Sequence, residues 1–140
     1  MEFKEVVAFL ETHHRGVIST KTQSGSVHVS IVFCGPYFGS AAFVSVYPRS
    51  QKIKNLRLDN HCSVLAVTDD WKSFVSIEGR ATLYDYVNTA PQKMQSLLRE
   101  VYMACSTTQH PNWEDFDAAM IKQKAVVVLV RPKMIYGSIR

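Results

Sequence analysis

The close spacing of the β-rich segments is the feature that most constrains the fold of this chain. Five segments rich in β-branched and apolar residues precede two helical segments, and a final pair follows. They are residues 16–22, 27–34, 41–47, 62–68 and 74–84, then 125–130 and 134–140. Parallel strands need crossovers of about a dozen residues or more, so the short connections predict antiparallel hairpins. Helical periodicity occupies residues 3–14, 50–58, 89–101 and 113–123. We therefore predict a mainly β, α+β fold: an antiparallel barrel with flanking helices.

The segment at 27–34, VHVSIVFC, alternates between two faces. Its more apolar face consists of Val27, Val29, Ile31 and Phe33. Because one face of a strand normally packs on the core, we expect these four side chains to point inward. The opposite face mixes polar and small residues, which suits either solvent or a flat ligand lying against the strand.

Three further segments carry specific expectations. Residues 35–40, GPYFGS, contain two glycines and a proline and predict a loop. Gly79 lies in the middle of the longest strand, which indicates a bulge, a barrel corner or the close approach of another backbone. The run AVVVLV at 125–130 is continuously apolar, so we expect a strand buried on both faces, separated by residues 131–133 from a second short strand.

Composition narrows the class of protein. A chain of 140 residues that is 46% hydrophobic and 20% charged fits a single globular domain over residues 1–140. The net charge of +4 favours anionic ligands. Three widely spaced cysteines form no C-x-x-C pair, so we expect neither disulfides nor a zinc site, and a reducing cytoplasm. The first residues contain acids among the apolar positions, which predicts neither a signal peptide nor a membrane span.

The junction between the strand at 41–47 and the helix at 50–58 is a candidate anion site. Arg49, Lys52, Lys54 and Arg57 fall within nine residues that contain no acid. Free backbone N–H groups at a helix start, together with clustered cations, can hold an anion such as a phosphate. A solvent-exposed basic helix would show the same pattern.

Four motifs, in order along the chain, resemble one family. They are K-x-[KR]-N-L at residues 52–56, apolar-E-G-x-A at residues 77–81, HPNWEDFDAAM at 110–120, and V-x-V-x-P-x-x-I-Y-G at 128–137. On these residues the chain resembles the flavin-binding split-barrel proteins related to pyridoxamine 5′-phosphate oxidase. The resemblance implies a split β-barrel. The last two motifs are similar to the branch whose members use FMN or a deazaflavin coenzyme.

The resemblance also implies a site. It places a phosphate at Lys52, with help from Ser45 and the neighbouring basic side chains, and an isoalloxazine ring along the strand from Ser30 to Phe33. The implied cofactor-binding residues are Ser30, Ile31, Val32, Phe33, Ser45, Val46, Arg49, Gln51 and Lys52. Many family members have an arginine two residues before the phosphate lysine; here that position is Ser50, which leaves open whether Arg49 reaches the phosphate. The family further implies a homodimer with the cofactor at the interface.

These expectations lead to a flavin- or deazaflavin-dependent oxidoreductase that passes a hydride to a small substrate, with catalytic residues unassigned. FMN is favoured over the deazaflavin, which continues past its phosphate into an acidic tail and so needs several cations on one side of the helix. Helix geometry turns Lys54 about 200° from Lys52, so these two cations cannot face the same tail. The alternatives are a non-catalytic flavin or haem carrier and a barrel that binds single-stranded nucleic acid on Phe43, Tyr47 and Phe74. We expect neither a membrane nor a nucleic acid as partner, and no hydrolase or nucleotide-triphosphatase motif is present.

Overall fold

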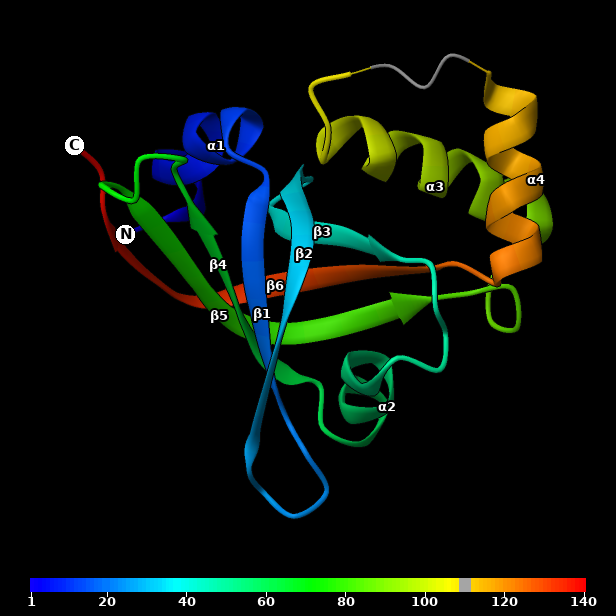
Figure 1. Cartoon of the computed structure of the whole chain (residues 1–140), viewed down its shortest axis with the longest axis horizontal. Coiled ribbons are helices and arrows are strands. Elements are labelled where there is room, and N and C mark those ends of the chain that lie inside the picture. Colours follow the sequence, from blue (N-terminus) through cyan, green and yellow to red (C-terminus); the bar gives the residue numbers. More distant parts are fainter. Residues whose placement is uncertain (109–111) are drawn as a thin grey trace.

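The computed structural model describes residues 1–108 and 112–140, in which six antiparallel strands form a closed barrel flanked by four helices (Figure 1). The strands are β1 (Arg15–Lys21), β2 (Val27–Tyr37), β3 (Ser40–Ser45), β4 (His61–Val67), β5 (Phe74–Tyr84) and β6 (Val126–Ser138). The helices are α1 (Phe3–Thr12), α2 (Gln51–Leu58), α3 (Pro91–Ala104) and α4 (Trp113–Gln123). Around the barrel the strand order is β1-β2-β3-β6-β5-β4, which confirms the predicted fold class. His110 and Pro111 of the third motif lie outside the described residues.

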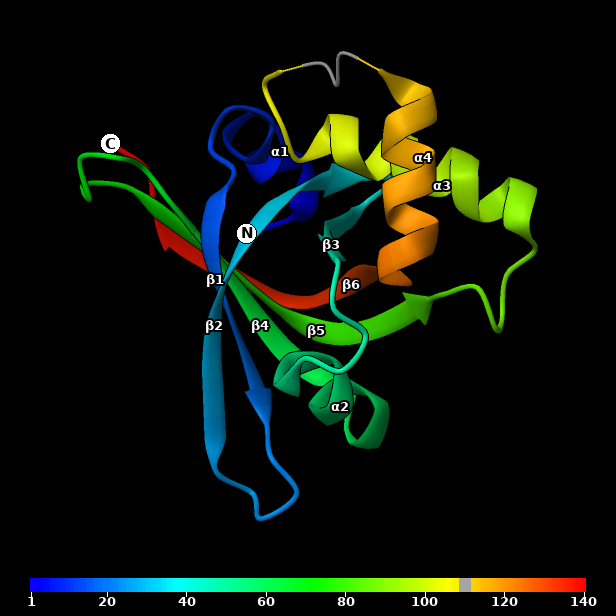
Figure 2. The same cartoon turned by 45° about the vertical axis from the view of Figure 1, so that its right-hand side comes forward.

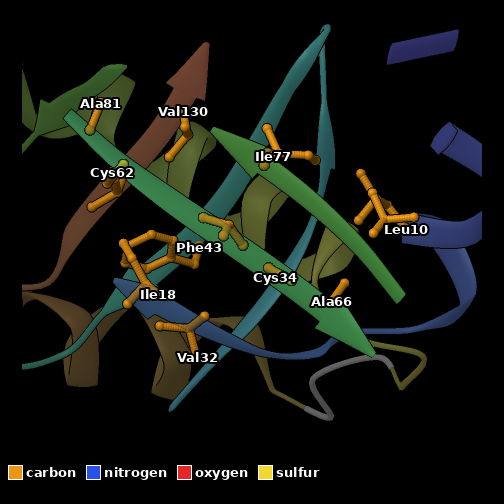
Figure 3. Close-up of a cluster of buried hydrophobic side chains, with 14 of the residues drawn as sticks. Leu10, Ile18, Val32, Cys34, Phe43, Cys62, Ala66, Ile77, Ala81 and Val130 are labelled. Atoms are coloured by element: carbon orange, nitrogen blue, oxygen red, sulfur yellow. The ribbon is translucent and has the colours of Figure 1, made fainter. Parts of the chain in front are cut away.

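The barrel interior is one apolar cluster to which two helices contribute. Phe43, Ile18 and Ile77 are fully buried among the strands, as Figure 3 shows. Leu10 of α1 and Ile53 of α2 belong to the same cluster. The two helices lie towards opposite ends of the barrel (Figures 1 and 2). Because Ile53 in the first turn of α2 is fully buried in this cluster, the barrel core fixes the position of that turn.

A second cluster lies outside the barrel, where α3 and α4 cover β3 and β6. Val127 of β6 packs there with Leu98 of α3 and Phe116 of α4, whereas Val126 and Val128 point into the barrel. The apolar run at 125–130 is therefore buried on both faces, as predicted, because one face meets the core and the other meets the helices. None of the helices in the described ranges has the length and apolar character needed to cross a membrane.

Two of the predicted breaks between strands are wrong. Residues 35–37 continue β2, and the loop shrinks to a turn at Phe38 and Gly39 with φ of 45° and 79°. The predicted final strand pair is one strand, β6, which crosses Pro132 with a register shift opposite Gly79. A Cβ on Gly79 would lie 1.8 Å from the Arg131 carbonyl oxygen, so the expected bulge and close approach at Gly79 are confirmed.

The orientation predicted for β2 is also wrong. Val27, Val29, Ile31 and Phe33 are 61–78% exposed, whereas Val32 and Cys34 are buried in the barrel. The pairing explains this, because Val32 lies opposite Gly16 and Ser30 lies opposite Ile18, both on the inner face of β1. Both faces of β2 carry apolar residues near its C-terminal end, so apolar pattern alone could not choose between them. The result is an apolar stripe on the outside of the barrel.

Candidate cofactor site

The candidate site begins where β2 and β3 separate. The two strands pair only over Cys34–Tyr37 and Ser40–Phe43, and residues 27–33 pair with β1 on their other edge. The Cys34 N–H points towards β1, where it donates to the His14 carbonyl oxygen at 2.8 Å. Backbone groups alternate along a strand, so those of Ile31 and Phe33 point away from β1. In the described part of the chain no strand pairs with this edge of residues 27–33, which leaves it able to bond a planar ligand.

The predicted junction between β3 and α2 has the form of an anion site. Ser45 is buried; its Oγ donates to the Tyr47 carbonyl oxygen at 3.3 Å and lies 3.5 Å from Ser50 Oγ. Ser50 is the N-cap of α2, but its side chain makes no capping hydrogen bond, and the first turn contains no acid. The first N–H groups of α2 therefore have no side-chain partner in the described chain. Sequence reasoning treated Ser50 only as a missing arginine, yet its hydroxyl lies at this helix start.

The basic residues of this junction are not equivalent. Lys52 is half-buried, and burial lowers its pKa. Lys54 and Arg49 are exposed. Arg57 donates to Asp85 at 2.8 Å, so this cation already has a carboxylate partner. Lys52 is thus the cation that folding desolvates at the helix start, and an anion bound there would offset that cost.

Two residues of α2, Gln51 and the motif residue Asn55, have structural roles. Gln51, a predicted cofactor ligand, donates its side-chain N–H to Asn55 Oδ1 at 2.7 Å. The buried Asn55 in turn donates to Thr20 Oγ1 of β1 at 3.0 Å. These bonds anchor α2 to the barrel and so orient Lys52. Ser30 faces inward on β2, and its buried Oγ has no hydrogen-bond partner within the described residues.

Phe33 and Val46 meet at a cavity of about 480 Å³ that sequence reasoning did not anticipate. Its lining consists of Phe33, Val44, Val46, Tyr102, Cys105, Ser106, Phe116 and Met120. Helical periodicity predicted that Phe116 and Met120 face inward, but it carries no information about which strand they face. The structure brings α3 and α4 to the same side of β2 and β3 as the exposed stripe.

The proposed stacking surface for nucleic acid is wrong. Phe43 is fully buried in the barrel core, so its ring cannot contact a base (Figure 3). Tyr47 is exposed and Phe74 only partly so. Without Phe43, the row of aromatic platforms on which that alternative depended does not exist.

Comparison with known proteins shows the family of this chain. The family model described as pyridoxamine 5′-phosphate oxidase matches residues 3–136. The chain belongs to that family. Among solved structures, a conserved hypothetical protein from Mycobacterium tuberculosis is 21% identical with a TM-score of 0.77, over 98% of this chain and 84% of that one. The family resemblance inferred from the motifs is confirmed.

Two further structures share the fold. An F420 reductase is 16% identical with a TM-score of 0.64, over 92% of this chain and 94% of that chain. A heme storage protein from Vibrio cholerae is 12% identical with a TM-score of 0.69, over 97% of this chain and 94% of that one. At these identities the likeness concerns the fold alone, and the two names describe different functions within it.

Proposed function

We propose that this protein is an oxidoreductase that binds FMN along β2 and passes a hydride between FMN and a small substrate. The observation that carries the proposal is the continuity of two features. The unpaired edge and exposed apolar side chains of β2 lie where β2 and β3 separate, and β3 leads within a few residues to the uncapped, cationic start of α2. A flavin nucleotide needs such a combination of a flat apolar surface and a phosphate site.

In this proposal, residues of β2 bind the flavin ring and the start of α2 binds the phosphate. Ile31 and Phe33 contact the ring, and their backbone groups bond its polar edge. Lys52, the N–H groups of the first turn of α2 and the Ser50 hydroxyl hold the phosphate. Bound FMN would supply the hydride chemistry, while the protein orients it and excludes water.

We propose a homodimer, because no helix lies over the outer face of β1 and β4 in Figures 1 and 2, and this face carries apolar side chains. On the outer face of β2, β1 and β4, Ile31, Val17 and Leu65 form an apolar row across the sheet. Val29 and Phe33 extend it along β2, Val67 extends it along β4, and Tyr136 of β6 lies in the same row beyond Ser76 of β5. Large contiguous apolar patches mark interaction surfaces. A second copy with the same face would bury this patch symmetrically and cover the ring bound beside β2.

FMN is the proposed cofactor rather than the deazaflavin coenzyme. A deazaflavin continues past its phosphate into an acidic, polar tail, which needs several cations on one side. Here Arg57 is bound to Asp85, and Lys54 is exposed on a different side of α2 from Lys52. Of the four cations at this junction, Lys52 and Arg49 remain for such a tail.

Titration of cofactor-free protein with FMN and with the deazaflavin tests this choice. We expect FMN to bind more tightly, and the double substitution Lys54→Gln with Arg57→Gln to leave FMN affinity nearly unchanged. Tighter binding of the deazaflavin, lost selectively in that double variant and at raised salt, would move the chain to the deazaflavin-dependent branch.

A non-catalytic flavin or haem carrier is the second candidate, because one structural neighbour is a heme storage protein. Parallel titration with FMN and hemin separates the two. Saturable FMN binding, followed by reoxidation of the reduced flavin by an added acceptor, supports the oxidoreductase. Saturable hemin binding without FMN binding would support the carrier.

A further inference from the structure

We infer that the substrate site is a two-lobed cavity divided by Phe33, and that it takes an uncharged amphiphilic molecule: an apolar ring system with a hydroxyl- or carbonyl-bearing end. The inference rests on the proposed function, because it places the substrate beside the ring position on β2. It adds the class of substrate and the residues of α3 and α4 that select it.

The two lobes meet at three shared residues. One cavity of about 480 Å³ and another of about 290 Å³ are both lined by Phe33, Cys105 and Ser106. The first opens over β3 and beneath α4, and the second opens over the start of β1 and the end of β4. Phe33 is 63% exposed, so its ring divides the lobes without being locked in the core. Volumes of this size are usual for small-molecule sites, roughly 300–1,000 Å³.

The end of α3 packs closely against the barrel, and this contact forms the wall that both lobes share. Cys105 Sγ donates to the Ala42 carbonyl oxygen at 3.2 Å and is buried. A Cβ on Gly35 would lie only 1.9 Å from the Ala104 carbonyl oxygen, so the end of α3 rests directly on the backbone of β2. The lobes are therefore preformed by backbone packing, which lowers the cost of ordering the site when a ligand binds.

The larger lobe is apolar. Apart from the shared residues it is lined by Val44, Val46, Tyr102, Phe116 and Met120, none of which carries a charge. Tyr102 and Phe116 pack against each other with ring centroids 5.0 Å apart. Aromatic walls with an adaptable methionine suit a flat apolar ring system.

The smaller lobe is polar and contains both signs of charge. Its lining adds Thr12, His13, His14, Arg15, Val67, Asp69 and Thr107. Arg15 and Asp69 lie 3.6 Å apart, and their side chains are 74% and 85% exposed, so this ion pair is weak. Either side chain can therefore leave the other and bond to a ligand instead. An anionic head would meet Asp69 and a cationic head would meet Arg15. A neutral head that both accepts and donates hydrogen bonds can use both residues and the hydroxyls.

Prodan, an uncharged naphthyl ketone whose emission shifts to the blue in apolar surroundings, is a probe with this chemistry. Anilinonaphthalene sulfonate provides a similar ring system with an anionic head. We expect the full-length protein, with and without FMN, to bind prodan saturably at one site per subunit and more tightly than the sulfonate. Tighter binding of the sulfonate, or no saturable prodan binding, would overturn the proposed substrate class.

Matched substitutions locate the probe. Met120→Trp fills the apolar lobe and Ser106→Leu blocks the junction; each should weaken prodan binding by about tenfold or more. Met103→Trp and Ser96→Leu make the same changes at exposed positions of α3 outside both lobes and should leave affinity within about twofold. Ser106 lies in the connection after α3, so its variant still decides the question if Met120→Trp does not fold.

The binding results for these variants distinguish the proposed substrate site from the proposed FMN site. Equal prodan affinity in a lobe variant and its control would refute the two-lobed site, even if FMN binds normally. Failure of the wild type to bind FMN, with prodan binding still sensitive to Ser106→Leu, would refute the cofactor assignment and leave the cavity as a site for amphiphilic ligands.

Discussion

Replacement of Lys52 by methionine should weaken FMN binding without destabilising the protein. Lys52 is half-buried, and a charge-assisted hydrogen bond to a phosphate contributes about 1.5–3 kcal/mol. At about 1.4 kcal/mol per factor of ten, that predicts FMN affinity roughly 10- to 150-fold lower. Binding should not vanish, because the N–H groups at the start of α2 remain.

The same substitution should act in the opposite direction on stability. Burial lowers the pKa of Lys52 from its ordinary 10.5, so the unfolded chain holds this proton more tightly than the folded protein. The cofactor-free wild type should therefore gain stability as pH rises from the lowered pKa towards 10.5. Methionine has no charge to desolvate, so the variant should be at least as stable near neutral pH and should lack that gain.

Lys54→Met is the matched control, because Lys54 is exposed on the same helix. Fluorescence titration with FMN gives the affinities, and urea unfolding across a pH series gives the stabilities. Equal FMN affinity in the Lys52 variant and the wild type, or equal losses in both variants, would refute the phosphate site. Clear destabilisation by Lys52→Met without cofactor would refute the argument from burial.

Three further outcomes are expected. Ile31→Lys should convert a dimer to a monomer of 15.9 kDa by light scattering, whereas Ile121→Lys, the same change at an exposed position of α4, should not; dimers in both would contradict the proposed interface. Gly79→Ala should lower the free energy of unfolding by about 2–4 kcal/mol, because its Cβ would collide with the Arg131 carbonyl at 1.8 Å, and an unchanged urea midpoint would contradict this. Burial raises the pKa of Cys34 and Cys62 to about 12 and raises that of Cys105 as well, so a thiol reagent at neutral pH should label all three only after unfolding; rapid native labelling would argue against it.

The order of apolar residues and glycines along the chain predicted features that depend on sequence neighbours, but not features that depend on how strands pair. The apolar run at 125–130 indicated a doubly buried strand, and the glycine at 79 indicated a bulge, a barrel corner or a close backbone approach; the buried strand, a register shift and a close approach are present. The inward face of β2 could not be predicted, since Val32 and Cys34 fill the barrel as well as Ile31 and Phe33 would. That choice is made by register with β1, where Gly16 and Ile18 face inward.

The candidate site, too, could be predicted only in part from the sequence. The motif at 52–56 correctly indicated a cationic helix start after a strand, and the structure gives Asn55 of that motif an anchoring bond to Thr20. The partner of Arg57 and the contribution of α4 were beyond prediction, because Asp85 and Phe116 come from distant segments placed by tertiary packing. Sequence spacing identifies which residues share an element, but not which elements meet.

The visible absorption spectrum of protein purified without added cofactor tests the central claim most directly. The account predicts a yellow protein with the bands of an oxidised flavin, and release of FMN rather than a larger nucleotide when the protein is unfolded. A Soret-type haem band, or a colourless protein that does not acquire flavin bands when FMN is added and unbound FMN is removed, would contradict it.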